Sequence, residues 1–335
     1  MTSIKDIAKE CNVSVATVSK ALNDHDDISA ATKEKVRKAA KKLGYLTNAT
    51  ARALKTKKTY NLGILFADER AGLSHEYFSM ILESFQREAE KYGYDITFIN
   101  HAIAGEVTTY LRHVEYRDLD GIAIMTADFG DPEIIELAES DVPVVIVDYV
   151  MDKCAAVLSD NSRGLDAIVR YAYDMGHRKI AFIHGDYTSV TTERISSFRS
   201  TCARLGIDIP EEYVVAGHYH DIKDCGEKTA QLLALKDPPT LIIFPDDYSY
   251  IGGMEVINSR GLSVPNDISA AGYDGINMAK IMNLTTYEQN TQEIGQLAVR
   301  KLLQLINEPD LPPERVIVSG KLIYGKTIKD LKKGR

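Results

Sequence analysis

Short apolar runs alternate with longer amphipathic stretches from residue 61 to the end of the chain, and this alternation constrains the fold more than any other feature. Stretches such as YFSMILESFQREAEKYG (77–93) have helical periodicity. Alternating strands and helices predict βαβ units with parallel sheets. The runs fall into two groups on either side of Asp160, so we expect an α/β body of two doubly wound parallel-sheet lobes. Eight runs predict buried strands: LGILF (62–66), DITFIN (95–100), GIAIM (121–125), PVVIVD (143–148), KIAFIHG (179–185), EYVVAG (212–217), TLIIFP (240–245) and ISAAGYD (268–274).

The first 46 residues follow a different pattern, that of short helices joined by a tight turn. Ser3 and Asp6 have the spacing of a capping box at the start of one helix. Asn12 tolerates the left-handed conformation that a tight turn needs, and Ser14 predicts the N-cap of a second helix. The residues of this second helix that we expect to face inward are Val15, Val18 and Leu22.

A third helix is expected within SAATKEKVRKAAKKLGY (29–45), with Thr32 as its cap and Gly44 as its stop. Two short helices joined by a tight turn and closed by a third predict an all-α helix-turn-helix unit. Such a unit places its second helix in the major groove of DNA. On the exposed face of that helix, Thr17 and Ser19 can donate hydrogen bonds to phosphates and Lys20 adds a charge.

The distribution of charge supports a DNA-binding N-terminus, although the whole chain carries a net charge of −8. Residues 1–60 hold 13 lysines and arginines against 6 aspartates and glutamates, whereas the remainder holds 27 against 42. A basic end on an acidic body is typical of a protein that contacts DNA with one end. A solvated basic face without a partner is the alternative interpretation of the charge alone.

The segment IKDIAKECNVSVATVSKALN (4–23), followed by GYLTNATARALKTKKT (44–59), resembles the LacI/GalR (lactose-repressor) family of bacterial transcription regulators. The likeness extends over nearly the whole chain. The sequence departs from the family pattern at Lys20, where the family usually has arginine, and at Thr47, where it usually has proline. Lysine lacks the planar fork with which arginine bonds guanine, which weakens a prediction of guanine at that half-site position.

The resemblance implies lobes like those of type I periplasmic binding proteins, with three crossings of the chain between them, near Asp160, Gln289 and Gly320. It also implies an ordering hinge between the helix-turn-helix unit and the lobes. The expected domains are a helix-turn-helix domain (1–46), a hinge helix or linker (47–60) and an effector-binding and dimerisation domain (61–335), with an N-lobe of about 61–160 and 290–320 and a C-lobe of about 161–289 and 321–335.

The expected partner is palindromic operator DNA, read by a homodimer, because one small helix-turn-helix unit offers too little interface for high specificity. In the family, the hinge places a leucine from each protomer in the minor groove at the operator centre, and Leu54 occupies that place here. Such an apolar wedge partly unstacks a base step and kinks the duplex. The candidate DNA-binding residues are Ser14, Val15, Ala16, Thr17, Ser19, Lys20, Asn23, Thr32, Tyr45, Asn48, Ala51 and Leu54.

Ligands of open α/β sheets bind outside the carboxyl ends of the strands, so polar residues at those ends are candidates for an effector site. Carboxylates and a guanidinium facing a cleft suit hydrogen bonds to sugar hydroxyls, and an aromatic pair offers stacking faces. In the family, residues matching Arg194 and Asp274 bind the effector; we expect Arg194 at the start of its helix. The candidates are Asp68, Tyr77, Phe78, Asp148, Arg194, Asp246, Asp247, Tyr273 and Asp274.

We therefore expect a transcriptional regulator, most commonly a repressor in this family, that is controlled by a small molecule between the lobes. A sugar is expected, because the carboxylates would repel a phosphorylated ligand. A nucleobase is an alternative effector, because Tyr77 and Phe78 form an adjacent aromatic pair. A phosphorylated carrier protein is a second alternative effector. Two other classes are a solute-binding transport component, which the body alone would permit, and an architectural DNA binder that ignores small molecules.

No enzymatic chemistry is expected. The motif SDN (159–161) has no S-x-x-K or KTG partner, and G-x-G-x-x-G, P-loop and G-x-S-x-G motifs are absent from the sequence. His218 and His220, expected on one strand face, have no third ligand nearby in sequence, so neither a metal nor a cofactor is expected.

The N-terminus MTSIKDIAKE has no apolar signal segment, no run of about 18 apolar residues predicts a membrane span, and the four separated cysteines fit reduced thiols. We expect a cytoplasmic protein, at the nucleoid when bound to DNA.

Overall fold

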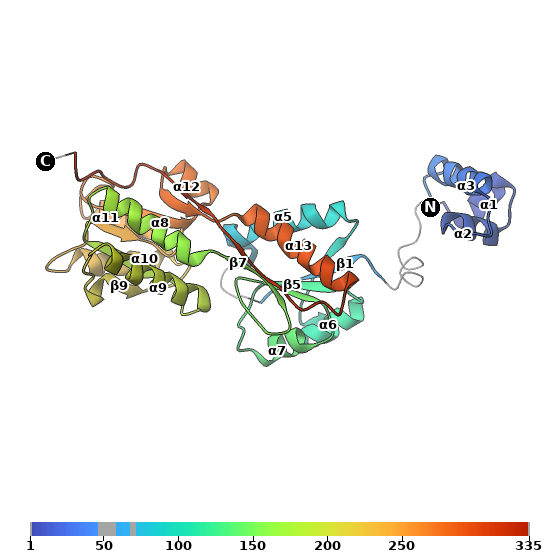
Figure 1. The fold of residues 1–335 in the computed structure, drawn as a ribbon, viewed down its shortest axis with the longest axis horizontal. Helices are drawn as coiled ribbons and strands as arrows, with labels where there is room; N and C mark the ends of the chain where they lie inside the picture. Colours follow the sequence, from blue (N-terminus) through green and yellow to red (C-terminus); the bar gives the residue numbers. More distant parts are fainter. Residues whose placement is uncertain (1, 46–57, 68–71, 334–335) are drawn as a thin grey trace. The chain divides into compact units, whose positions relative to one another are not determined.

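The computed structural model describes residues 2–45, 58–67 and 72–333. The chain forms two compact units, Met1–Thr59 and Tyr60–Arg335 (Figure 1). Three helices build the first unit: α1 (Ile4–Cys11), α2 (Val15–Leu22) and α3 (Ala30–Lys42). In these described ranges, no helix is both long enough and apolar enough to cross a membrane.

The N-terminal unit is the expected helix-turn-helix. The backbone N–H of Ser3 donates to Asp6 Oδ2 at 2.8 Å, which completes the start of α1. Asn12 adopts the left-handed conformation at φ 50° and turns the chain into α2, where Ser14 Oγ accepts from the backbone N–H of Thr17 at 3.0 Å. A small core closes the three helices; its fully buried members include Ile7, Cys11, Val18, Ala21 and Val36.

Two local expectations in this unit are wrong. Ser29 rather than Thr32 caps α3, because Ser29 Oγ accepts from the backbone N–H of Thr32 at 3.3 Å and the two intervening alanines are strong helix formers. Val15 does not face inward: its side chain is 41% exposed. The buried stripe of α2 is formed by Val18 and Ala21, and Val15 lies at the exposed N-terminal end of the helix.

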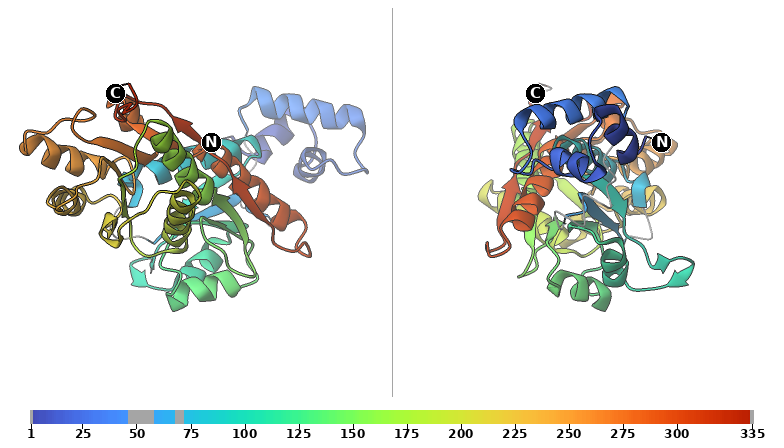
Figure 2. Two further views of the ribbon diagram at one scale, coloured as in Figure 1. Left: turned by 60° about the vertical axis from the view of Figure 1, so that its left-hand side comes forward. Right: turned by 90° about the vertical axis from the view of Figure 1, so that its right-hand side faces the viewer.

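The first lobe of the body is a sheet with the strand order β13-β7-β6-β5-β1-β2, parallel throughout its described pairings. Its side chains alternate between two cores, so that α5 and α13 cover one face and α6 and α7 the other (Figures 1 and 2). The strands are β1 (Asn61–Phe66), β2 (Asp95–Phe98), β5 (Gly121–Thr126), β6 (Val144–Val147), β7 (Ala155–Ser159) and β13 (Arg315–Val318), with a small hairpin of β3 (Ala102–Ile103) and β4 (Glu106–Val107). The helices are η1 (Gly72–Ser74), α5 (Glu76–Lys91), α6 (Tyr110–Arg117), α7 (Pro132–Glu139) and α13 (Thr291–Asn307).

The second lobe repeats this architecture with the strand order β14-β12-β11-β10-β8-β9, in which only β14 is antiparallel to its neighbour among the described strands. Helices α8 and α9 cover one face, and α10, α11 and α12 cover the other. The strands are β8 (Ile180–His184), β9 (Val214–Ala216), β10 (Leu241–Ile243), β11 (Ser269–Asp274), β12 (Thr285–Glu288) and β14 (Lys321–Ile323). The helices are α8 (Asn161–Asp174), α9 (Ser189–Arg204), η2 (Glu211–Tyr213), α10 (Ile222–Leu233), α11 (Tyr250–Ser259) and α12 (Asn277–Ile281).

The chain passes between the two sheets three times. It leaves the first sheet after β7, returns from β12 through α13, which packs on β5, β6 and β7, and leaves again between β13 and β14. The fold therefore confirms two doubly wound lobes built on parallel sheets. Each lobe presents the carboxyl ends of its strands to the region where the crossings occur, which is where the candidate site residues lie.

A buried histidine in the first lobe makes stability depend on pH. His113, in α6, is 1% exposed, and neither of its ring nitrogens has a hydrogen-bond partner in the described part of the chain. Burial, and secondarily Arg117, lowers the pKa of this imidazole below its ordinary value. Below about pH 6.5 the His113 imidazole is protonated in the unfolded chain but stays neutral in the folded chain. The free energy of unfolding should therefore fall as the pH falls.

We expect His113→Leu to remove this part of the pH dependence. For one such histidine the loss between pH 7.5 and 5.5 is bounded by about 1.4 kcal/mol. Urea unfolding of both proteins at the two pH values measures it, and the comparison at pH 7.5 isolates any change in packing. An equal loss of stability on acidification in both proteins would show that folded His113 accepts the proton.

Candidate functional site

Arg194 is the most buried cation of the candidate site, with 4% of its surface exposed. The helix α9 begins at Ser189, after the N-cap residue Thr188, and Arg194 lies in its second turn. The expectation that Arg194 starts the helix is therefore wrong. Its Nε donates to Asn161 Oδ1 at 2.8 Å, and its Nη1 donates to the carbonyl oxygen of Pro245 at 3.0 Å. Within the described residues no carboxylate lies at ion-pair distance from this guanidinium.

Tyrosine rings and more distant carboxylates surround Arg194. Its guanidinium carbon lies 3.6 Å from the ring centre of Tyr273 and 5.8 Å from that of Tyr219. Burial opposes the charged form, but the tyrosines, Asp274 and Asp148 outweigh it, so the pKa of Arg194 is raised. The side chain therefore stays charged at the junction of the lobes, with donors available for a ligand.

Asp274 ends β11 beside this cation and is 6% exposed. Gln289 Nε2 donates to Asp274 Oδ1 at 2.7 Å. Burial raises the pKa of Asp274 to about 7, and the Arg194 guanidinium opposes that rise. Two neighbouring buried atoms, Gln289 Oε1 and Tyr273 Oη, have no hydrogen-bond partner among the described residues. Buried polar atoms are normally hydrogen-bonded. Tyr273 Oη packs against Gly164 of α8, where an added Cβ would lie 2.0 Å away, so Gln289 Oε1 is the atom of this pair that could accept from a ligand.

The first lobe contributes Asp148, which follows β6. It accepts from the backbone N–H of Ser159 at 2.6 Å and from Tyr77 Oη at 2.7 Å. Tyr77 is itself 4% exposed and packs in the core of the lobe, and Phe78 packs edge-on against Phe66. The tyrosine thus positions the carboxylate instead of offering an open stacking face.

Asp246 and Asp247 hold the backbone of the second lobe. Asp246 accepts from the backbone N–H groups of His220 at 2.8 Å and Ser249 at 2.7 Å. Asp247 Oδ2 accepts from the backbone N–H groups of Gly275 and Ile276, and burial, followed by Asp274, raises the pKa of Asp247 well above its usual range. These two carboxylates fix the loops that follow β10 and β11, a role that a strand-end position does not reveal.

A pocket of about 220 Å³ is lined by residues of both lobes. Glu193, on α9 next to Arg194, lies in its wall, and its pKa is raised by burial and then by Asp148 and Asp160. Tyr149 stacks flat on Phe129, with ring centres 3.8 Å apart. The lining residues are Asp148, Tyr149, Val150, Leu158 and Ser159 from the first lobe and Asn161, Ser189, Val190 and Glu193 from the second.

The lobes also touch directly. Asn277 donates to Glu76 Oε1 through its backbone N–H at 3.1 Å and its side-chain Nδ2 at 2.8 Å. The His220 ring stacks between those of His75 and Tyr248, with centres 4.2 Å and 4.1 Å away. Of the site residues missed in the sequence, His220 gave a signal as half of a histidine pair, and Asn161 and Gln289 lay at the expected crossings between the lobes. Glu193 gave no signal.

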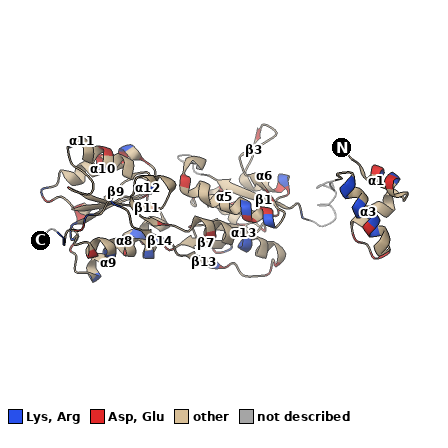
Figure 3. Ribbon diagram, turned by 90° about the horizontal axis from the view of Figure 1, so that it is seen from above, with Lys and Arg blue, Asp and Glu red and all other residues tan. Residues whose placement is uncertain are grey.

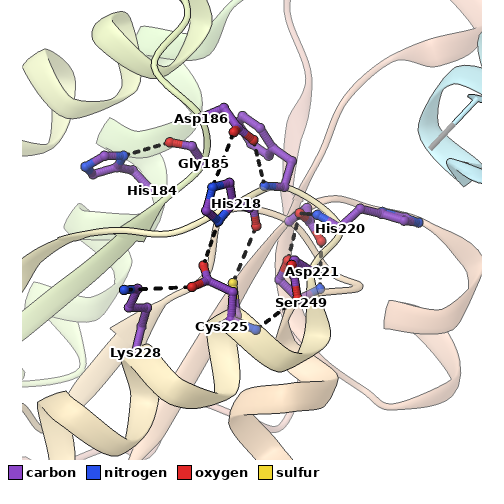
Figure 4. Close-up of polar contacts among 12 residues, drawn as sticks. His184, Gly185, Asp186, His218, His220, Asp221, Cys225, Lys228 and Ser249 are labelled. Carbon is purple, nitrogen blue, oxygen red and sulfur yellow. Dashed lines mark hydrogen bonds and ion pairs between the residues drawn. The ribbon is translucent and has the colours of Figure 1, made fainter. Parts of the chain in front are cut away.

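His218 and His220 do not share a strand face, because both follow the end of β9 and point to different groups (Figure 4). His218 Nδ1 lies 3.1 Å from Asp224 Oδ2, and its Nε2 lies 3.7 Å from Asp186 Oδ1. No group of three or more metal-ligating side chains with suitable geometry occurs within the described ranges. The arrangement ties the loop after β9 to α10.

The DNA-contacting candidates lie on the N-terminal unit. Ser14, Val15, Ala16, Lys20 and Asn23 are exposed. The partly buried candidates are Thr17, Ser19, Thr32 and Tyr45. Lysines and arginines line α3 (Figure 3): Lys33, Lys35, Arg37, Lys38, Lys41 and Lys42. Four candidates, Asn48, Ala51 and Leu54 of the predicted hinge and Asp68 of the effector site, lie outside the described residues.

Two families match the chain: "Bacterial regulatory proteins, lacI family" over residues 3–48 and "Periplasmic binding protein-like domain" over residues 169–328. A probable HTH-type transcriptional repressor ExuR from Bacillus subtilis (strain 168) is 31% identical over 338 residues, which cover 99% of each chain. Such relatives are transcriptional repressors, which confirms that the chain is not an enzyme.

Solved structures share the fold. The lac repressor dimer bound to operator and the anti-inducer ONPF has a TM-score of 0.79 and 24% identity, covering 98% of this chain and 99% of that one. The complex of the transcriptional regulator CelR with cellobiose has a TM-score of 0.71 and 22% identity, covering 98% of this chain and 100% of that one. The helix-turn-helix unit and the two lobes together therefore form a known architecture.

Proposed function

This chain belongs to the LacI family of bacterial regulatory proteins as a transcriptional repressor, and we propose that its effector is a neutral, hydroxyl-rich small molecule such as a sugar. The effector binds between the two lobes, and the protein binds palindromic operator DNA as a homodimer. One observation carries the choice of ligand class: the pocket shared by the lobes is lined by Asp148 and Glu193, and its described lining includes no lysine or arginine.

The chemistry of the wall favours a polyhydroxyl ligand. Carboxylate oxygens accept hydrogen bonds from hydroxyls, whereas a phosphate would meet two like charges without a lining cation. Tyr149, braced by Phe129, offers an aromatic face at the same wall, which suits the apolar face of a sugar ring. Arg194 and Asp274 lie outside this lining. Arg194 acts on it through Asn161, a lining residue whose Oδ1 accepts from Arg194 Nε at 2.8 Å.

The same ligand couples the pocket to DNA. Asp148 belongs to the first lobe and Glu193 to the second, so an effector that contacts both biases how the lobes face each other. In a homodimer this changes the spacing of the two N-terminal units, with residues 47–60 as the proposed hinge. The coupling is reciprocal, so operator DNA changes effector affinity by the same factor.

A nucleobase is a second candidate, favoured by one feature. His75, His220 and Tyr248 form a stack across the lobes, with ring centres 4.2 Å and 4.1 Å apart. A flat base would stack at a similar spacing on one of the outer rings, His75 or Tyr248. His220 Nδ1 has no partner among the described residues, so it could exchange a hydrogen bond with a base edge.

Thermal unfolding of the full chain against free sugars, sugar phosphates and nucleobases tests the proposal. Saturation at about 100 times the dissociation constant adds about 2.7 kcal/mol, which raises the melting temperature by about 5 °C. We expect a shift with a neutral sugar and none with its phosphate ester. A shift confined to nucleobases or to sugar phosphates would reject the sugar, and no shift at all would favour a protein co-regulator.

A further inference from the structure

Lys20 is the single charged residue of α2, whose sequence is VATVSKAL. Its ammonium forms an ion pair with Asp27, in the loop between α2 and α3. Both side chains are about half exposed, 48% for Lys20 and 53% for Asp27. The pair therefore lies at the surface of the helix that a helix-turn-helix unit presents to DNA.

The loop that supplies Asp27 is acidic. Asp24 pairs with Lys33 at 3.1 Å and with Arg37 at 2.9 Å, which ties the loop to α3. Asp26 is exposed and has no ion pair among the described residues. Asp24 thus ties the loop to α3, Asp27 pairs with Lys20, and Asp26 is exposed to solvent.

From this geometry we infer that Asp27 is a positioning residue that makes Lys20 read a base rather than bind phosphates. The inference rests on the proposed binding of operator DNA through α2. A free lysine is a flexible point charge that binds any phosphate. Paired with Asp27, the ammonium attracts phosphates less strongly, and its side chain favours the rotamers that keep it beside the carboxylate. Two of its three N–H donors remain, and these can bond the adjacent O6 and N7 acceptors of a guanine.

The pair thereby gives lysine a constraint that arginine has by itself. Arginine is rigid through its planar guanidinium, and its fork selects guanine without help. Lysine needs an external constraint to do the same, and Asp27 supplies it. The carboxylate also repels phosphates nearby, which weakens binding to DNA of unrelated sequence.

Two variants of the full chain separate this role from a general effect of charge. Asp27→Asn removes the pair, and Asp26→Asn removes the same charge from the same loop without touching Lys20. A duplex selected by the wild-type protein from a randomised pool serves as the operator. Binding is then measured on this duplex, on its single-base variants and on a scrambled duplex, over a range of salt concentrations.

We expect Asp27→Asn to bind scrambled DNA about two- to fivefold more tightly. The logarithmic salt dependence should steepen by about two for a dimer, because each freed lysine can neutralise a phosphate. Discrimination should fall at one base pair in each half-site, the one whose recognition Lys20→Ala also abolishes. Asp26→Asn should leave the discrimination ratios unchanged.

Several results would overturn the inference. Equal effects of Asp27→Asn and Asp26→Asn on discrimination would show that Asp27 acts only through its negative charge and does not position Lys20. An effect of Asp27→Asn that persists in the Lys20→Ala background would show that it does not act through Lys20. Recovery of no preferred duplex by the wild-type chain would instead reject the proposed operator binding, which keeps the two failures distinguishable.

Discussion

Replacing Arg194 by alanine should abolish the response to effector while operator binding survives. The guanidinium is buried, donates to Asn161 and Pro245, and lies on the Tyr273 ring. Hydrogen bonds to charged groups contribute about 1.5–3 kcal/mol each, so loss of the bond that positions Asn161 in the pocket wall should weaken effector binding by about 100-fold. Titration calorimetry with the effector found by the thermal screen measures this, and operator affinity without effector is measured beside it.

Arg199→Ala is the matched control, because Arg199 belongs to the same helix but pairs at the surface with Glu211 at 2.8 Å. It should leave effector binding unchanged. Arg194→Lys should retain little of the affinity, because an ammonium cannot reproduce the two donor directions of the guanidinium. Full effector affinity in Arg194→Ala would mean that the ligand binds elsewhere.

The largest expected effect on stability comes from Gly252→Ala. Gly252 lies in α11 where this helix crosses the start of α10, and an added Cβ would lie 1.8 Å from the carbonyl oxygen of Ile222. The nearest atoms are all backbone atoms of α10, so no side chain can rotate away and the helices must separate. Overpacking of this kind should cost about 3 kcal/mol of unfolding free energy, as measured by urea unfolding.

Gly226→Ala provides the comparison from the opposite helix. Its added Cβ would lie 3.2 Å from the carbonyl oxygen of Gly252, a distance that a small shift relieves. The better helix propensity of alanine offsets that shift, so the stability should stay within about 1 kcal/mol of the wild type. Similar stabilities for the two variants would show that α10 and α11 separate without cost.

The sequence predicted the elements whose signals are local. The capping residues of α1 and α2 and the eight predicted strands depend on neighbours within a few residues. Burial was wrong for two of these strands, because β2 and β9 lie at sheet edges and are partly exposed. The two-residue strands β3 and β4 were missed, and so were four strands of the main sheets, β7, β12, β13 and β14. Two of them are edge strands that pair far along the chain, as Arg315 does with Ala156. Such pairing depends on tertiary structure, which periodicity does not record.

The candidate site was predictable in position but not in detail. Strand-end reasoning placed Asp148, Tyr273 and Asp274 near the junction of the lobes, and resemblance added Arg194. The same reasoning also selected Asp246 and Asp247, because a carboxylate that accepts from the backbone looks the same in sequence as one that faces a ligand. Residues such as Asn161 and Gln289 became candidates only through their contacts with Arg194 and Asp274.

The three crossings of the chain between the sheets limit which parts of this protein can be replaced by engineering. Neither lobe is one continuous piece of sequence, so neither can be excised, exchanged or duplicated as a cassette. A new effector specificity has to be introduced by grafting individual side chains into the pocket. The N-terminal unit ends at Thr59 and is continuous, so a different operator preference can be transplanted with a single junction. Effector specificity and operator preference thus require different engineering strategies.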